Sequence, residues 1–376
     1  MLDRESLQEH CEALLQQRLF LQQMKLTKLS QLKKHDGRVV DSLRLLKRFL
    51  PLKKPSVSLS LVFASSDEWL HIASENEESI DQDFLIYLAE LSVALSVNSG
   101  KKLVDALILS DSISATRVGF ELALRCNVEV SQDVYYQLDA EHLHNYLMFL
   151  GKSAKVGQLS FLNDLISNLN VEHTLKNTAR LSRLLLGYDE NASNLVVQLI
   201  EHDQLTDESL AVLLAFITEN EFQSLIKDLS NRSDIETSLV ISALTHSASP
   251  QYIPFLAEFL SSESMRESVL EGFAVQLGDD QSALLPYELF HPLREVAWSS
   301  VDSEQLEKDI LAWFHSASNS WPSKMLAGEE RSLLNIENTW LTGNSIQRKH
   351  ASFCLATENP HTPLRSEISL WGGISA

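Results

Sequence analysis

The stretch that decides the fold runs from Ser249 to Gly278 and reads SPQYIPFLAEFLSSESMRESVLEGFAVQLG. Each half carries four apolar residues at positions i, i+3, i+4 and i+7, namely Ile253, Leu256, Ala257 and Leu260, then Leu270, Phe273, Ala274 and Leu277. This spacing places apolar side chains on one face of an α-helix. Because a Ser-rich turn separates the halves, the stretch predicts two short antiparallel helices. Pro254 has no amide hydrogen to donate and is expected to bend the first helix.

The same apolar spacing recurs along the chain, for example at Phe84, Tyr87, Leu88 and Leu91, and at Leu210, Leu213, Leu214 and Ile217. Asp139 and Thr206 each follow a leucine and precede another leucine by four residues, which is typical of a capped helix start. A short helix pair cannot cover its own apolar face, so successive pairs must stack. The sequence therefore predicts an all-α protein, an α-solenoid of degenerate antiparallel helix pairs, with no strand between residues 82 and 285.

Composition supports a helical protein. Gly accounts for 12 of the 376 residues, which is under half of its usual share of about 7%, and sheets and phosphate-binding loops need Gly. The longest apolar run, Leu210 to Ile217, is too short to span a bilayer, and the N-terminal residues do not resemble a secretory signal. We expect a cytoplasmic protein without a membrane partner. The three Cys are scattered and form no CxxC pair, so we expect them to be buried small apolar residues.

Charge is distributed unevenly. The formal net charge is −20, and residues 1–63 contribute +6 from 12 Lys/Arg and 6 Asp/Glu, so the remainder carries −26. So acidic a surface repels nucleic acid and favours a protein partner with a basic surface. The basic N-terminal segment either contacts an acidic partner or a phosphate, or is a solvated helix face that packs against the acidic remainder.

In the N-terminal region the sequence predicts one or two helices over residues 6–34, a break at His35-Asp36-Gly37, and another helix from Val39 to Leu50. The alternation of apolar residues with serines over residues 57–61 indicates a short strand or an extended linker. We expect three segments: a basic helical segment at 1–63, an acidic repeat array at 64–285, and a connector with a Trp-rich helical cap at 286–376. The last segment is predicted to hold a helix over 303–316 and one further helix pair.

Residues 249–278 resemble a HEAT repeat, a family in which an acidic turn residue and an Arg early in the second helix commonly interact; here these are Glu263 and Arg266. Both chain ends resemble an uncharacterised bacterial HEAT-like family whose members are often encoded near type VI secretion genes. The matching motifs are Glu9-His10-Cys11-Glu12, His35-Asp36-Gly37-Arg38, and Trp340-Leu341…Gly343…Gln347-Arg348…Ala351…Leu355-Ala356…Pro363-Leu364. Gly37 departs from the family pattern, which has an acidic residue there. The resemblance implies a role near the secretion machine and brings no catalytic residues.

Motifs for catalysis are absent from the sequence. Gly151-Lys152-Ser153 lacks the earlier Gly that a phosphate-binding loop needs, because Tyr146 occupies that position. The chain has no GxSxG and no HExxH motif, and His142 and His144 point to different helix faces. Each His is expected to be a satisfied surface side chain. We therefore expect a protein that is not an enzyme, with no catalytic residue, no cofactor and no metal.

Tryptophan is concentrated near the C-terminus, where five of the six Trp lie at or after residue 298. Two interpretations stay open: a cap whose rings cover the last repeat, or a surface that binds a partner, since Trp is frequent among interface hot spots. Under the second interpretation the candidate protein-binding residues are Trp340 and Trp371.

The leading functional hypothesis is a binding scaffold or adaptor that handles an effector or assists assembly in type VI secretion. The first alternative is an immunity-type protein that neutralises a toxin. Further alternatives are a HEAT-like DNA-binding protein or glycosylase, and an enzyme acting on a small molecule.

Overall fold

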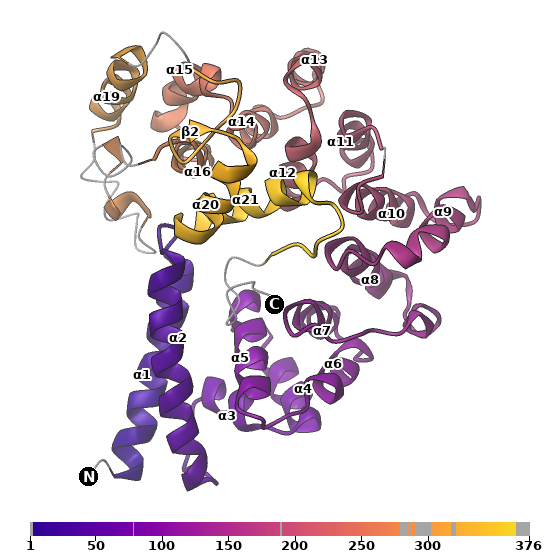
Figure 1. Ribbon diagram of the computed structural model, residues 1–376, viewed down its shortest axis with the longest axis vertical. Coiled ribbons are helices and arrows are strands. Elements are labelled where there is room, and N and C mark those ends of the chain that lie inside the picture. The colour runs from indigo at the N-terminus through magenta and orange to yellow at the C-terminus, as the bar shows by residue number, and fades with distance from the viewer. Residues whose placement is uncertain are drawn as a thin grey trace. The chain divides into compact units, whose positions relative to one another are not determined.

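The computed structural model describes residues 3–77, 79–188, 190–278, 284–285, 287–290, 302–316 and 321–365. The chain divides into two compact units, unit 1 being residues 1–155 with 365–376 and unit 2 being residues 156–364. Over the described residues the secondary structure is almost entirely helical, and its strands form one hairpin of two residues each, which confirms the all-α prediction (Figure 1). None of the helices in this described part combines the length and apolar character needed to cross a membrane.

Unit 1 consists of eight α-helices and two 3-10 turns over its described residues. They are α1 (Arg4–Gln23), α2 (Leu29–Leu46), η1 (Lys47–Phe49), α3 (Val57–Phe63), α4 (Ser66–Glu75), α5 (Gln82–Ala94), α6 (Gly100–Ile108), α7 (Ile113–Arg125), η2 (Gln132–Tyr136) and α8 (Ala140–Lys152). The first two form a long antiparallel hairpin, and the later ones pack on near neighbours in the chain, such as α6 on α7 and α7 on α8 (Figure 1).

The predicted break at His35-Asp36-Gly37 is wrong, because α2 runs through these residues. The chain reverses earlier, between α1 and α2, where the Thr27 hydroxyl donates to the Leu21 carbonyl at 2.7 Å. A glycine inside a helix costs about 1 kcal/mol, but Leu32, Val39 and Leu43 are buried on the opposite face and hold the helix together. Tertiary packing therefore outweighs the local preference of Gly37.

The alternating residues at 57–61 form neither a strand nor a linker but the helix α3. Ser56 caps this helix by accepting a hydrogen bond from the Leu59 amide at 3.4 Å. Leu59 and Val62 are three residues apart and both fully buried, so they share the helix face that packs against the rest of unit 1. Leu61 is buried as well, so the buried Leu59 and Leu61 lie two residues apart, and this spacing gives the sequence its strand-like alternation.

Unit 2 contains the remaining described elements. They are η3 (Val156–Gln158), α9 (Leu159–Ser167), α10 (His173–Leu185), α11 (Ala192–Glu201), α12 (Asp207–Phe216), α13 (Glu219–Asn231), α14 (Thr237–His246), η4 (Pro250–Tyr252), α15 (Ile253–Ala257), η5 (Glu258–Ser261), α16 (Arg266–Gln276), η6 (Tyr287–Phe290), α19 (Ser303–Ser316), β1 (Met325–Leu326), β2 (Glu329–Glu330), α20 (Leu333–Thr342) and α21 (Ser345–Glu358). The helix predicted at 303–316 and the final helix pair are both present.

Residues 249–278 form the predicted helix pair, but the first helix is divided. Pro254 lies at its start, and the helix is reduced to the short α15 between the 3-10 turns η4 and η5. The guanidinium group of Arg266 donates to the carbonyls of Leu260 and Ser261 at 2.8 and 3.4 Å. Arg266 therefore binds main-chain oxygens at the end of the first helix of this pair.

The C-terminal section satisfies carbonyls that earlier helices leave without a partner at their ends. The Gln347 amide donates to the carbonyls of Ala274 and Leu277 at 3.0 and 2.9 Å, at the end of α16. The Lys324 ammonium donates to the Ile217 carbonyl at 2.8 Å, just after α12, and burial lowers the pKa of this lysine to about 8. These contacts hold residues from the end of the sequence against the middle of unit 2.

The solenoid prediction is not confirmed by this arrangement. In a solenoid each repeat contacts only its neighbours, whereas α21 packs against both α12 and α16 (Figure 1). The two compact units also divide the chain at residue 155, away from the boundaries of the three segments expected at 1–63, 64–285 and 286–376. Those segments stay a prediction.

Candidate functional site

The two tryptophans predicted to bind a partner have different positions. Trp340 is 1% exposed and lies in a core cluster with Leu326, Ile336 and Cys354. Its ring packs inside unit 2 in this structure and presents no surface to a partner. Trp371, like Trp298, lies outside the described residues. Trp321 lies half-buried against α19, with its ring 5.1 Å from Trp313 and stacked on Phe314.

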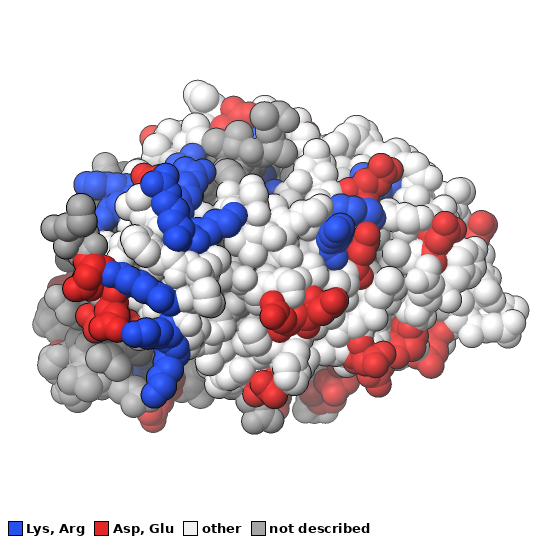
Figure 2. Space-filling model, turned by 90° about the horizontal axis from the view of Figure 1, so that it is seen from below, with Lys and Arg blue, Asp and Glu red and all other residues white. Residues whose placement is uncertain are grey.

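Exposed apolar side chains gather instead at one end of the α1–α2 hairpin. Leu45, Phe49, Leu50 and Val57 each expose 37–49% of their surface. Residues 44–57 also contain five Lys or Arg and no Asp or Glu, namely Arg44, Lys47, Arg48, Lys53 and Lys54. Figure 2 shows several Lys and Arg side chains on this side of the molecule, with Asp and Glu side chains beside some of them. We call the exposed side chains of residues 44–57 the hairpin-end surface.

The backbone that carries the hairpin-end surface is held on several sides. Lys47 donates to the Leu95 carbonyl at 2.7 Å, at the end of α5. From α1, Arg4 donates to the Pro51 carbonyl and Gln8 to the Lys53 carbonyl, while Glu12 accepts from the Ser56 amide at 3.0 Å. The backbone beneath this surface therefore has little conformational freedom to lose when the surface binds another molecule.

A buried ion pair supports the same hairpin from inside. The Arg18 guanidinium on α1 lies 2.7 Å from the Asp36 carboxylate on α2, and both side chains are buried. Tyr87 on α5 donates its hydroxyl to Asp36 at 3.0 Å, and its ring lies 4.3 Å from the Arg18 guanidinium carbon. Sequence patterns did not reveal this network, because a single charged residue on an apolar helix face carries no periodic signal.

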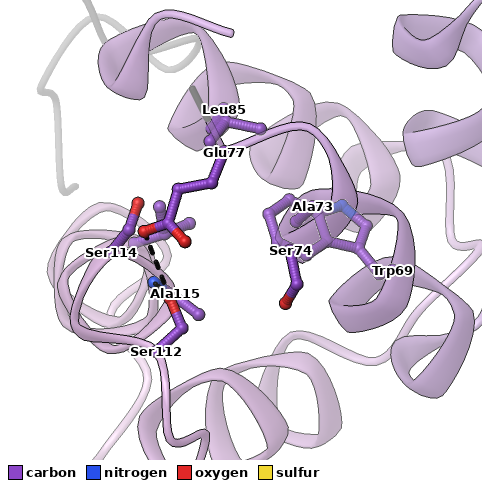
Figure 3. A pocket seen from close by; sticks show the side chains of 9 residues that line it. Trp69, Ala73, Ser74, Glu77, Leu85, Ser112, Ser114 and Ala115 are labelled. Carbon is purple, nitrogen blue, oxygen red and sulfur yellow. Dashed lines mark hydrogen bonds between the residues drawn. The ribbon is translucent and has the colours of Figure 1, made fainter. Parts of the chain in front are cut away.

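Unit 1 contains a small pocket between α4, α5 and α7. Trp69, Leu85, Ala115 and Val118 are among its apolar lining residues, and the Ser112 hydroxyl donates to the Glu77 carboxylate at 3.4 Å across it (Figure 3). Its volume of about 10 Å³ suits about one water molecule. Among the described residues the Trp69 indole nitrogen is buried and has no hydrogen-bond partner. The pocket is too small for a cofactor.

Unit 2 contains a larger pocket of about 40 Å³ between α12, α14, α16 and α21. We call it the α21 pocket; its lining includes Asp207, His246, Glu271, Lys349 and His350. The His246 Nε2 lies 2.8 Å from the Asp207 carboxylate, and hydrogen bonding by this imidazole lowers the pKa of the carboxyl.

His350 is a buried polar residue in the lining of the α21 pocket. It is 3% exposed, and in the part of the chain that the structure describes its Nε2 has no hydrogen-bond partner. Burial, together with the nearby positive charges of Arg331, His246 and Lys324, lowers the pKa of His350 to about 3. The ring is therefore neutral at physiological pH. The expectation that every His is a surface side chain is wrong here, and it is also wrong for His35 and His142, which are buried.

Sulfur chemistry receives no support from the cysteines. All three are free, and Cys11 and Cys354 are buried as expected, while Cys126 is partly exposed. Burial raises the pKa of the Cys354 thiol even though the Arg331 guanidinium lies 3.7 Å from its sulfur. A thiol that stays protonated is a poor nucleophile. Over the described ranges, no group of three or more His, Cys, Asp or Glu is placed to hold a metal ion.

Comparisons of the chain with protein-family models, with curated proteins and with solved structures found no match. The resemblance to a HEAT-like family therefore stays a prediction, and function has to be argued from the residues themselves.

Proposed function

We propose that the protein is a non-enzymatic binding scaffold that holds a protein partner at the hairpin-end surface. The observation that carries this proposal is the combination of exposed apolar side chains with five Lys or Arg and no Asp or Glu over residues 44–57. Two of these cations have exposed carboxylates beside them, since Arg44 lies 3.5 Å from Asp41 and Lys53 lies 3.5 Å from Glu5. Burying one large apolar side chain stabilises a complex by about 1.5–3 kcal/mol, and exposed apolar patches with polar rims mark interaction sites. The basic side chains around them favour acidic groups on the partner.

The charge of the rest of the chain adds a second requirement. Residues 64–376 carry −26, which favours a partner with a basic surface, as the sequence predicts. A partner of mixed charge meets both requirements. The resemblance of the chain ends supports a secretion-system effector or adaptor as this partner, and hence an accessory role in type VI secretion. The alternative from the same resemblance is an immunity-type protein that binds and neutralises one toxin.

Two double variants test the binding surface. The test variant is Leu45→Ser with Phe49→Ser, and the matched control is Leu109→Ser with Ile113→Ser, which are also four residues apart and are 52% and 47% exposed. Each tagged full-length chain is used to recover partners from cells that encode it, after circular dichroism has shown that the variants fold. We expect the control to recover the wild-type set of proteins and the test variant to lose its main member. Equal recovery by both variants would refute the proposal.

The recovered protein also separates the two roles. Recovery of structural or adaptor components of the secretion apparatus supports an accessory. Tight binding to one toxic effector, with loss of toxicity when both are expressed together, supports an immunity protein.

A further inference from the structure

The exposed side of α2 over residues 33–44, which we call the α2 outer face, carries a glycine that no described contact requires. Gly37 is exposed in the middle of the helix, and a Cβ added to it would meet no atom within 4 Å. Its φ angle is not in the left-handed region, so the backbone conformation does not require glycine either. Glycine destabilises a helix interior more than any residue except proline. Because glycine lets a second chain approach the backbone closely, a molecule packed on this face would give Gly37 a use.

Three exposed cations surround Gly37. Lys33 and Lys34 precede it by four and three residues, so they lie one helical turn away on the same face, and Arg38 follows it directly. Within the described part of the chain, none of these three side chains forms an ion pair. Their positive charges are therefore available to carboxylates of another molecule.

The α2 outer face continues into the hairpin-end surface. Arg44 belongs to both, and it lies seven residues after Gly37 and thus on the same side of the helix. Asp41 adds an exposed carboxylate, whose charge is offset by the Arg44 guanidinium 3.5 Å away. At the rise of an α-helix, the path from Lys33 to Leu45 is about 18 Å long, or roughly three turns. A surface of that length suits a helix of a partner better than a single side chain or a small ion.

We propose that the α2 outer face binds an acidic helix of the partner protein, with the backbone of that helix packed over Gly37 and its carboxylates paired with the surrounding cations. This inference rests on the scaffold function proposed above and names the chemistry of the partner. A nucleic acid is also anionic, but residues 64–376 carry −26 and repel a long polyanion more strongly than a short helix. The neighbouring Leu45 and Phe49 are exposed and suit the apolar side chains of a helix rather than phosphates.

Nuclear magnetic resonance of the full-length chain tests the site through the backbone amide of Gly37, which is assigned by its loss in Gly37→Gln. The probe is a capped peptide of about 20 residues, long enough to form a helix alone, built from Glu and Ala with one Leu in each turn. We expect a saturable shift of the Gly37 amide with this peptide and none with the same peptide carrying Lys in place of Glu. No saturable shift with the Glu peptide would overturn the proposal. A DNA duplex of about 20 base pairs that binds more tightly than the Glu peptide would also overturn it.

The variant Gly37→Gln separates binding from folding. Gln is the better helix former, so the midpoint of urea unfolding should rise. The added side chain occupies the space above the backbone, so we expect the affinity for the Glu peptide, measured by fluorescence anisotropy, to fall about fivefold or more. The control is Ala13→Gln, which places the same side chain at an exposed position of α1 and should leave the affinity unchanged. Equal affinities of Gly37→Gln and the wild type would contradict close packing over Gly37.

A second pair of variants tests the charges. Lys34→Gln with Arg38→Gln should weaken binding of the Glu peptide about tenfold, whereas Lys101→Gln with Lys102→Gln, at exposed positions of α6, should not. Equal affinities of these two double variants would contradict pairing with the α2 cations. The scaffold function is tested separately, with the recovered partner. If Leu45→Ser with Phe49→Ser loses that partner while the Glu peptide does not bind, the acidic helix is refuted and the scaffold function stands.

Discussion

Arg18 and Asp36 form an ion pair that is closed off from solvent, with Tyr87 bound to both. Removing one partner of a buried pair leaves an uncompensated charge, which typically costs about 3–5 kcal/mol. We therefore expect Arg18→Met to lower the free energy of unfolding by that amount, measured by urea denaturation. The control is Lys101→Met, which breaks the exposed Lys101–Asp105 pair and should cost less than about 0.5 kcal/mol. A loss below about 1 kcal/mol for Arg18→Met would contradict a structural role for the network.

His350 predicts a pH dependence of stability. The pKa of this histidine is about 3 in the folded chain against the ordinary 6.5, so between these values the unfolded chain holds more protons than the folded one. Stability therefore falls as the pH decreases from about 6.5 towards 3. His350→Leu lacks this effect, so from pH 7 to pH 5.5 the stability of the wild type should fall by about 1 kcal/mol relative to that variant. The control variant is His71→Leu, which replaces an exposed histidine. If the difference in the free energy of unfolding between the wild type and His350→Leu stays constant with pH, the burial of a neutral ring is contradicted.

At the scale of single residues, the sequence reveals little of either candidate site. Arg18 interrupts an apolar helix face, and His350 lies among both polar and apolar buried residues of α21, so neither has a spacing that sequence analysis can detect. Trp340 is predicted as a binding residue because Trp is frequent at interfaces, but Leu326, Ile336 and Cys354 pack around it in the core of unit 2. Whether a side chain is buried depends on which helices meet over it, and one sequence does not contain that information.

At the scale of elements, local signals predict well where neighbouring residues decide the structure. Asp139 and Thr206 cap α8 and α12 as predicted, each accepting a hydrogen bond from a first-turn amide. The predictions fail where distant contacts decide. Helix α2 continues through Gly37, and α3 forms where the sequence alternates, because burial against other helices outweighs the local pattern.

The end of α16 provides a test at the element scale. Gln347 satisfies two carbonyls there, and its side-chain oxygen also accepts from the Asn344 amide at the start of α21. Gln347→Leu leaves these buried groups without partners, so we expect it to lower the free energy of unfolding by about 1–3 kcal/mol. Gln223→Leu removes an exposed hydrogen bond to Glu219 and should have an effect of less than about 0.5 kcal/mol. Equal effects of the two changes, measured by urea denaturation, would show that residues 344–347 do not cap α16.

At the scale of the whole molecule, composition and periodicity predict the helical class but not the arrangement of helices. Scarce glycine and repeated apolar stripes indicate helix pairs, and the structure has them. The contact of α21 with α12 joins residues far apart in the sequence, and many apolar stripes could have met α12 equally well. The hairpin-end surface shows the same limit, since Leu45 and Phe49 fit a buried stripe by spacing alone yet are exposed.

The proposed scaffold function depends on binding by the hairpin-end surface, and the most direct test is the dissociation constant of the recovered partner, measured by titration calorimetry. We expect Leu45→Ser with Phe49→Ser to weaken binding at least tenfold, or about 1.4 kcal/mol, while Leu109→Ser with Ile113→Ser leaves it unchanged. Added salt should also weaken wild-type binding, because basic side chains surround the apolar ones. Equal dissociation constants for the two double variants would contradict the account.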